Sequence, residues 1–158
     1  MKSLSSVRDF LADKERCRTS GPRIREALEE ALSRVPDSIY DDLVHGDRPL
    51  YVAESSRITG VVALDCEGGS GVTLLTLARE LDDRAQGELV GIIAHELAHL
   101  ALGHRFISWE EKRKSRLREE YEADALACQW GFQRELMAAL EALTGVDEEA
   151  KRRRERLS

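Results

Sequence analysis

The sequence is poor in cysteine. Of its 158 residues only three are cysteines, Cys17, Cys66 and Cys128, and they lie far apart in the chain. An odd number of cysteines without close spacing indicates neither a disulfide framework nor a zinc site built from thiolates. Sparse, unpaired cysteines are typical of a reducing compartment. We therefore expect a cytoplasmic protein.

The sequence also lacks long apolar runs. No stretch approaches the ~18 apolar residues of a membrane span. The N-terminal segment MKSLSSVRDFLADKERC has no continuous apolar core of the kind that defines a signal peptide. The length favours a single domain, residues 1–158, with one sizeable hydrophobic core. We expect no membrane partner.

There is no surplus of positive charge. The 30 acidic residues outnumber 24 lysines and arginines and give a net charge of −6, so a nucleic-acid partner is not expected. The exception is KRRRER at residues 151–156. Because chain ends are poorly held unless something ties them down, we interpret residues 147–158 as a charged, solvated tail. The alternative is that this tail docks on a partner or an anionic surface.

Helical patterns occupy the first part of the chain. Residues 3–17 and 22–34 carry apolar positions at helical spacing, and Pro22 suits the first position of the second helix. The two predicted helices make up an N-terminal helical region, residues 1–36. The pattern then breaks at the sequence PDS.

Residues 49–81 change to a strand pattern. PLYVAE, RITGVVALD and GVTLLTLARE are short and rich in β-branched residues, and turn-forming residues separate them. They predict a small three-stranded sheet. Gly-Gly-Ser-Gly at residues 68–71 is interpreted as a turn, because no Lys-Ser or Lys-Thr follows it, as a phosphate-binding loop would require. We place the last strand, around Thr73 to Arg79, at the edge of the sheet.

The helical pattern returns at residues 87–104 and again in a long charged segment at residues 109–143. Trp109, Trp130 and the apolar positions of the second segment are expected in the core. The order of helices, three strands, helix and long helix predicts an α+β domain.

The sequence HELAHLALGH, residues 95–104, contains the pattern His-Glu-x-x-His. On a helix, His95 and His99 lie one turn apart and about 40° apart around the axis, so both imidazoles can bind one metal ion. Glu96 can face the remaining coordination position, hold a water molecule and accept its proton. The surrounding residues are nearly all apolar, and burying these three side chains there without partners would cost free energy. The segment therefore predicts one zinc ion.

His104 does not fit as a third ligand. On a continuous helix it lies about 180° from His95 and about 140° from His99. A three-histidine zinc helix places a glycine three residues, and a histidine six residues, after its second ligand. Those positions here are Leu102 and Arg105. We expect His104 at the helix C-terminus, near the last carbonyl groups.

A third ligand is predicted in REEYEADALACQWG, residues 118–131. Glu120 and Asp124 lie one helical turn apart. A helix packed across the first could therefore place Glu120 on the zinc ion and Asp124 on the outer nitrogen of a ligand histidine. Glu119 loses the one-turn relation with Asp124, and Glu122 diverges from Asp124 by about 200°. The predicted zinc site is a set of two histidines and one glutamate.

Together the two motifs resemble the gluzincin metallopeptidases that combine His-Glu-x-x-His with Glu-x-x-Ala-Asp, among them HtpX-like and CAAX-prenyl-protease-like enzymes. The resemblance covers residues 87–131. The membrane helices of HtpX-like enzymes are absent, so the chain looks like a soluble minimal version, similar to ImmA-type domains and minigluzincins. The downstream histidine or arginine motif with which larger relatives stabilise the oxyanion is not recognisable.

The resemblance implies a zincin-like fold and a zinc endopeptidase. His95, His99 and Glu120 would be the metal ligands, Glu96 the general base and Asp124 the partner of a ligand histidine. The expected partner is a protein or peptide substrate, and a regulatory protein is a further candidate. The alternative is a zinc-binding interaction module with little peptidase activity, although a purely structural site has no need of Glu96.

The oxyanion donor is left open by the sequence. Tyr51, His45, Tyr121 and Arg134 are candidates, and each fits a structural or surface role better. Cys128 is interpreted as a core cysteine.

Overall fold

The computed structural model describes residues 2–65, 71–104, 112–144 and 147–158. Within these ranges the chain forms seven α-helices and four strands. The helices are α1 (Leu4–Ala12), α2 (Pro22–Arg34), α3 (Asp37–His45), α4 (Gln86–Ala101), α5 (Lys112–Gln129), α6 (Gln133–Leu143) and α7 (Glu148–Leu157). The strands are β1 (Cys17–Arg18), β2 (Leu50–Ser55), β3 (Gly60–Asp65) and β4 (Gly71–Ala78), and a 3-10 helix, η1 (Arg79–Asp83), follows β4. The expected α+β class is confirmed.

The four strands form one mixed sheet in the order β1-β2-β4-β3. β2 and β4 are parallel, with Leu50 opposite Thr73, whereas β3 and β4 are antiparallel, with Val62 opposite Leu74. Burial alternates along most of β4, as expected for a strand that turns one face to the core. The three strands predicted from the β-branched segments are therefore present, and a fourth is added.

The added strand, β1, corrects the helix expected at residues 3–17. α1 ends at Ala12, and Asp13 follows it with an extended backbone. β1 then pairs in parallel with β2, with Cys17 opposite Val52. Cys17 is buried in the core. The apolar spacing could not separate the two structures, because both a longer helix and a short strand would bury Cys17.

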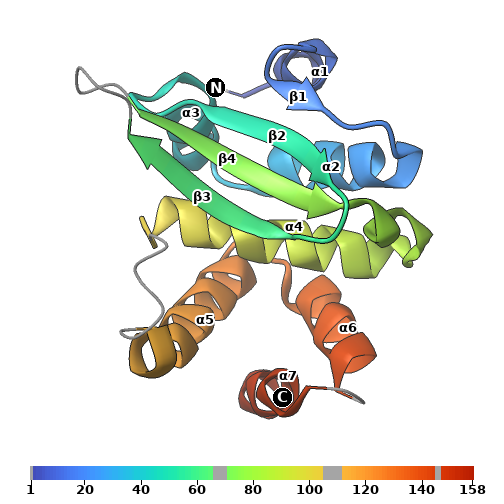
Figure 1. The fold of residues 1–158 in the computed structure, drawn as a ribbon, viewed down its shortest axis with the longest axis vertical. Coiled ribbons are helices and arrows are strands. Elements are labelled where there is room, and N and C mark those ends of the chain that lie inside the picture. The colour runs from blue at the N-terminus through green and yellow to red at the C-terminus, as the bar shows by residue number, and fades with distance from the viewer. Residues whose placement is uncertain (1, 66–70, 105–111, 145–146) are drawn as a thin grey trace.

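The expected position of the last strand at the sheet edge is wrong. β4 lies between β2 and β3, as Figure 1 shows, and pairs with both. β3 is an edge strand, because β4 is its one neighbour among the described strands. The order along the chain does not give the order in the sheet, since β4 inserts between two strands that precede it.

α4 is the central element of the core. It lies below the sheet in Figure 1, and α5 and α6 pack on its other side. Leu89, Ile93 and Leu97 are fully buried. A Cβ atom at Gly91 would lie 2.3 Å from the carbonyl oxygen of Glu135 at the start of α6. Glycine is therefore required at this point for the close approach of the two helices.

The single helix expected at residues 109–143 is two helices, α5 and α6, separated by residues 130–132. Gly131 has a φ of +88°, the left-handed conformation that commonly ends a helix. The N–H of Phe132 donates to the carbonyl of Ala127 at 3.1 Å and closes the turn. The apolar pattern runs on through this break because Phe132 is itself fully buried.

Residues 147–158 were expected to be a charged, solvated tail, and this expectation is wrong. They form α7, and the N-cap Asp147 accepts a hydrogen bond from the N–H of Glu149 at 2.8 Å. Acidic residues in the first turn and arginines in the last turn complement the helix dipole. α7 packs against α5 and α6, and Ala150 is buried.

The remaining expectations concern an additional helix, the cysteine and tryptophan residues, and membrane-spanning segments. Residues 37–45, for which no element was predicted, form α3. Cys66, most of the expected turn at residues 68–71, and Trp109 lie outside the described residues. Trp130 is partly buried and packs against the core. None of the described helices is both long and apolar enough to cross a membrane.

Candidate metal centre

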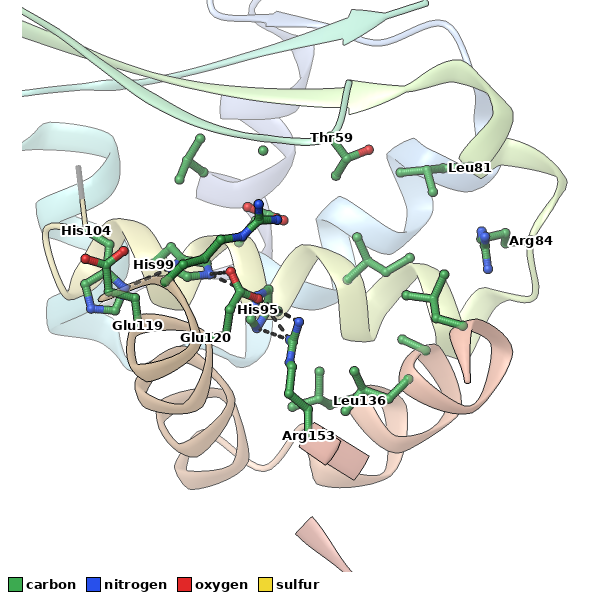
Figure 2. Close-up of a pocket in the computed structure, with 18 residues that line it drawn as sticks. Thr59, Leu81, Arg84, His95, His99, His104, Glu119, Glu120, Leu136 and Arg153 are labelled. Carbon is green, nitrogen blue, oxygen red and sulfur yellow. Dashed lines mark hydrogen bonds and ion pairs between the residues drawn. The ribbon is translucent and has the colours of Figure 1, made fainter. Parts of the chain in front are cut away.

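The residues of the His-Glu-x-x-His pattern lie in the middle and last turns of α4. Apolar residues bury this helix on nearly all sides, so its position is set by core packing. His95 and His99 are themselves buried, with exposed fractions of 7% and 8%. Figure 2 shows their rings side by side, with Glu120 of α5 facing them. The structure thus brings together the three residues predicted as metal ligands.

The spacing of the three donor groups suits a metal ion. The Nε2 atoms of His95 and His99 are 3.0 Å apart. The Glu120 carboxylate lies 3.1 Å from the first through Oε2 and 3.5 Å from the second through Oε1. A tetrahedral zinc ion with bonds of ~2.0–2.1 Å separates its ligand atoms by about 3.4 Å. His95, His99 and Glu120 could therefore hold a metal ion with small adjustments.

The outer nitrogen of His95 is held by Asp124. Nδ1 of His95 lies 2.9 Å from Oδ1 of Asp124, a residue that is only 2% exposed. Because an ionised carboxylate only accepts hydrogen bonds, Nδ1 carries a proton, and Nε2 faces Glu120. A histidine held by a carboxylate in this way has its tautomer and ring orientation fixed for metal binding.

The same contacts favour positive charge at this position. Burial opposes a charge on His95, but hydrogen bonds to Asp124 and Glu120 outweigh it and raise the pKa of His95 to about 9. Burial would raise the pKa of Glu120, but its contacts with the two histidines and the positive charges of His95 and Arg153 lower it. The cluster therefore favours carboxylates in their ionised form together with a cation.

Glu96 has a different environment. It lines the same cleft as the two histidines. Desolvation by the surrounding protein raises the pKa of Glu96, and the neighbouring histidines only partly offset this effect. A carboxylate with a raised pKa next to a metal site suits a group that accepts and returns a proton near neutral pH.

Arg153 is a residue of the site that sequence reasoning missed. It reaches the cluster from α7, as Figure 2 shows. Its Nη1 donates to Oε2 of Glu120 at 2.6 Å, and its Nε and Nη2 donate to the two carboxylate oxygens of Asp124 at 2.8 and 2.7 Å. Nη2 also lies 3.2 Å from Nδ1 of His95 and 3.3 Å from Nε2. One guanidinium thus connects Glu120, a candidate metal ligand, with Asp124, which contacts His95.

A signal for Arg153 was present in the sequence. Ala150, Arg153 and Leu157 are spaced by three and four residues and so lie on one face of a helix. Ala150 is buried, and Leu157 packs against the core. The high density of arginines in this segment made it resemble a solvated end, whereas one of them is on the buried face.

The other residues considered for the site lie in different places. Among the described residues, the group that could share a metal ion does not include His104, whose Nδ1 lies 2.8 Å from Nδ1 of His99. Glu119 lines the cleft, and Glu122 contacts His104. None of the four residues considered as oxyanion donors is among the described residues that line the cleft. These four are Tyr51, His45, Tyr121 and Arg134. Cys128 is only partly buried and packs against the core cluster.

The site opens into a cleft of about 410 Å³. One wall is apolar and consists of side chains from α4 and α6, including Ile92, Leu136 and Leu140. Gly60 and Val61 of the edge strand β3 also line the cleft. The chain matches no protein-family model, no curated protein and no solved structure.

Proposed function

We propose that this protein is a zinc-dependent endopeptidase of the gluzincin type. The observation that carries the proposal is the donor set of His95, His99 and Glu120, with ligand atoms 3.0–3.5 Å apart, beside Glu96 in one cleft. Two imidazoles and one carboxylate are a common ligand set of catalytic zinc, and three protein ligands leave a fourth position for water or substrate. Zinc, when bound, supplies a Lewis acid that polarises a carbonyl group and acidifies water.

Glu96 is the proposed general base. Its carboxylate would take a proton from the attacking water and return that proton to the nitrogen of the leaving amine. The raised pKa of Glu96 helps the first transfer, because a stronger base takes the proton from water more readily and holds it until the amine leaves. A purely structural zinc site would have no use for this residue.

Asp124 and Arg153 would position the ligands. Asp124 keeps the proton of His95 on Nδ1, and Arg153 holds the carboxylates of Asp124 and Glu120 in place through 2.6–2.8 Å hydrogen bonds. Since charge-assisted hydrogen bonds of this length are strong and directional, the two residues limit the motion of the ligand side chains.

The cleft favours an extended peptide as the substrate. β3 has an unpaired edge within the described sheet, and its first residues, Gly60 and Val61, line the cleft. A substrate strand could add to this edge through main-chain hydrogen bonds. The apolar wall formed by residues such as Leu136 and Leu140 suits a large apolar side chain next to the cleaved bond.

Two measurements on one pair of proteins test the proposal. Metal analysis is expected to find one zinc ion per chain in both the wild type and Glu96→Gln. Incubation with a proteome-derived peptide library, read by mass spectrometry, is expected to show cleavage by the wild type and a loss of about 10²–10⁴-fold in Glu96→Gln. Glu88→Gln is the matched control, because Glu88 lies in the first turn of the same helix, where it pairs with Arg84 at 3.2 Å.

The outcomes separate the alternatives. If neither protein binds zinc, the metal site is wrong. Zinc binding without cleavage by the wild type would instead favour a zinc-binding interaction module.

A further inference from the structure

His104 is brought back to the metal centre by a turn at the end of α4. The helix ends at Ala101, and Gly103 adopts a φ of +66°. The N–H of His104 then donates to the carbonyl of His99 at 3.0 Å. This left-handed glycine turn reverses the direction that a continuous helix would give His104, and it places the ring beside that of His99.

The ring of His104 lies between His99 and a carboxylate. Its Nδ1 is 2.8 Å from Nδ1 of His99, and its Nε2 is 3.3 Å from Oε2 of Glu122. The other oxygen of Glu122 accepts a hydrogen bond from Nε of Arg118 at 2.7 Å. The side chain of His104 is only 12% exposed, whereas that of Glu122 is 42% exposed, so the contact with His99 is sheltered and the contact with Glu122 lies at the surface.

These distances define where the protons lie. Glu122 is an acceptor, so neutral His104 carries its proton on Nε2 and offers the lone pair of Nδ1. The 2.8 Å contact between the two Nδ1 atoms is then a hydrogen bond donated by His99. As a result Nε2 of His99 has no proton, and its lone pair faces Nε2 of His95 and Oε1 of Glu120. That is the form of histidine that binds a metal ion.

We propose that His104 and Glu122 form a proton-holding relay that positions His99 as a metal ligand. The proposal rests on the zinc site proposed above. Each ligand histidine then has its own partner at Nδ1: Asp124 for His95, and His104 backed by Glu122 for His99. His104 and Glu122 act through His99 and do not touch the metal position themselves.

The first measurement uses the metal-free protein, so that it does not depend on zinc. Long-range ¹⁵N–¹H correlation spectra of the imidazole rings report which nitrogen carries the proton. We expect His99 to be protonated on Nδ1 in the wild type and to become a mixture of both tautomers in His104→Ala. In His104→Asn the side-chain oxygen can still accept from Nδ1, and we expect the wild-type tautomer to return.

The second measurement is zinc affinity by competition with a chelator. Loss of a partner of a ligand histidine typically weakens metal binding about 10–100-fold, and we expect a loss in this range for His104→Ala and a smaller one for Glu122→Gln. His104→Asn should recover most of the affinity. Leu102→Ala is the matched control, since Leu102 lies in the same turn with 41% of its surface exposed. Circular dichroism checks that each variant is folded.

The two proposals fail in different ways. A wild type that binds no zinc would overturn the metal site, and the tautomer of His99 would still test the hydrogen bond itself. A wild type that binds zinc, with unchanged affinity in His104→Ala, would overturn the relay as a positioning device. Equal losses in His104→Ala and His104→Asn would overturn it as well, because a merely structural role of the ring would not be restored by an acceptor.

Discussion

α4 and α7 both deliver functional side chains to the same centre, but different forces hold them there. α4 is buried by residues such as Leu89, Ile93 and Leu97, which are fully inaccessible to solvent. Ala150 is the one residue of α7 that is buried. Besides this residue and the partly buried Leu157, α7 is held by the contacts of Arg153 with Glu120 and Asp124. One helix is placed by its hydrophobic surface, and the other by the charges of the site that it completes.

The comparison teaches that the two helices should respond differently to change at the metal centre. Hydrophobic burial does not depend on the charge state of the site. Ion pairs in a buried cluster do, because removing one partner leaves the others uncompensated. Changes to the charges should therefore affect α7 most, while changes in packing should affect α4.

The largest effect is expected from Arg153→Met, which removes the cation and keeps a long side chain. In the metal-free protein we expect a loss of about 3–5 kcal/mol in the free energy of unfolding, because the buried carboxylates of Glu120 and Asp124 lose the guanidinium and, among the described residues, keep only His95 as a cationic partner. Zinc should reduce the loss, since it returns positive charge to the same carboxylates. Urea unfolding with and without zinc measures both quantities.

The neighbouring residue provides the control for this change. Arg152 is exposed, so Arg152→Met should alter the free energy of unfolding by no more than about 0.5 kcal/mol. Equal effects of the two substitutions would show that charge contacts do not hold α7.

A smaller effect is expected from Gly91→Ala, which tests the packing of α4. The added Cβ would meet the carbonyl oxygen of Glu135 at 2.3 Å, so α4 and α6 would have to separate. We expect a loss of about 1–3 kcal/mol in the free energy of unfolding, as is usual for overpacking. Thermal and urea unfolding measure it.

Gly87→Ala is the matched control on the same helix. No atom lies within 4 Å of a Cβ built at Gly87. The substitution should therefore stabilise the protein by up to about 1 kcal/mol through helix propensity. A similar loss at both glycines would contradict the close contact of α4 and α6.

The smallest effect concerns local opening. Amide hydrogen exchange in the metal-free protein should show α7 opening with a lower free energy than α4, because few apolar contacts hold α7. We expect a difference of at least tenfold in protection, or about 1.4 kcal/mol. Equal protection in the two helices would mean that α7 opens only when the whole protein unfolds.

The parts of the fold that were predicted share a local signal. The strands β2, β3 and β4 have β-branched residues between turn-forming residues, and α2 and α4 have apolar positions at helical spacing. Where the structure differs, the pattern was compatible with two structures. Phe132 continues the apolar spacing of a single helix across the break at Gly131, and Cys17 would be buried in either a helix or a strand. At both positions, the packing of the rest of the chain decides which of the two structures forms.

The candidate site shows the same division. His95, Glu96 and His99 follow from a five-residue spacing on one helix, and Asp124 follows from its one-turn relation to Glu120. That the residues of α4 and α5 lie close together was inferred from the length of the segment between the two motifs. The distances from His95 to Glu120 and to Asp124 agree with this inference. The contact of His104 with His99 depends on the left-handed turn at Gly103, and a helix continued in a straight line gives the opposite direction.

By itself the sequence determined the elements whose residues are close in the chain: the helix with the His-Glu-x-x-His pattern, the strands and the spacing of the acidic residues on α5. Tertiary structure alone decided which strand is the edge, where α5 ends and α6 begins, and that Arg153 reaches Glu120 and Asp124. The physical reason is the separation along the chain of the residues that interact. Spacing along a helix or strand is set by local backbone geometry, whereas an ion pair between residues 33 positions apart forms only after the helices between them have packed.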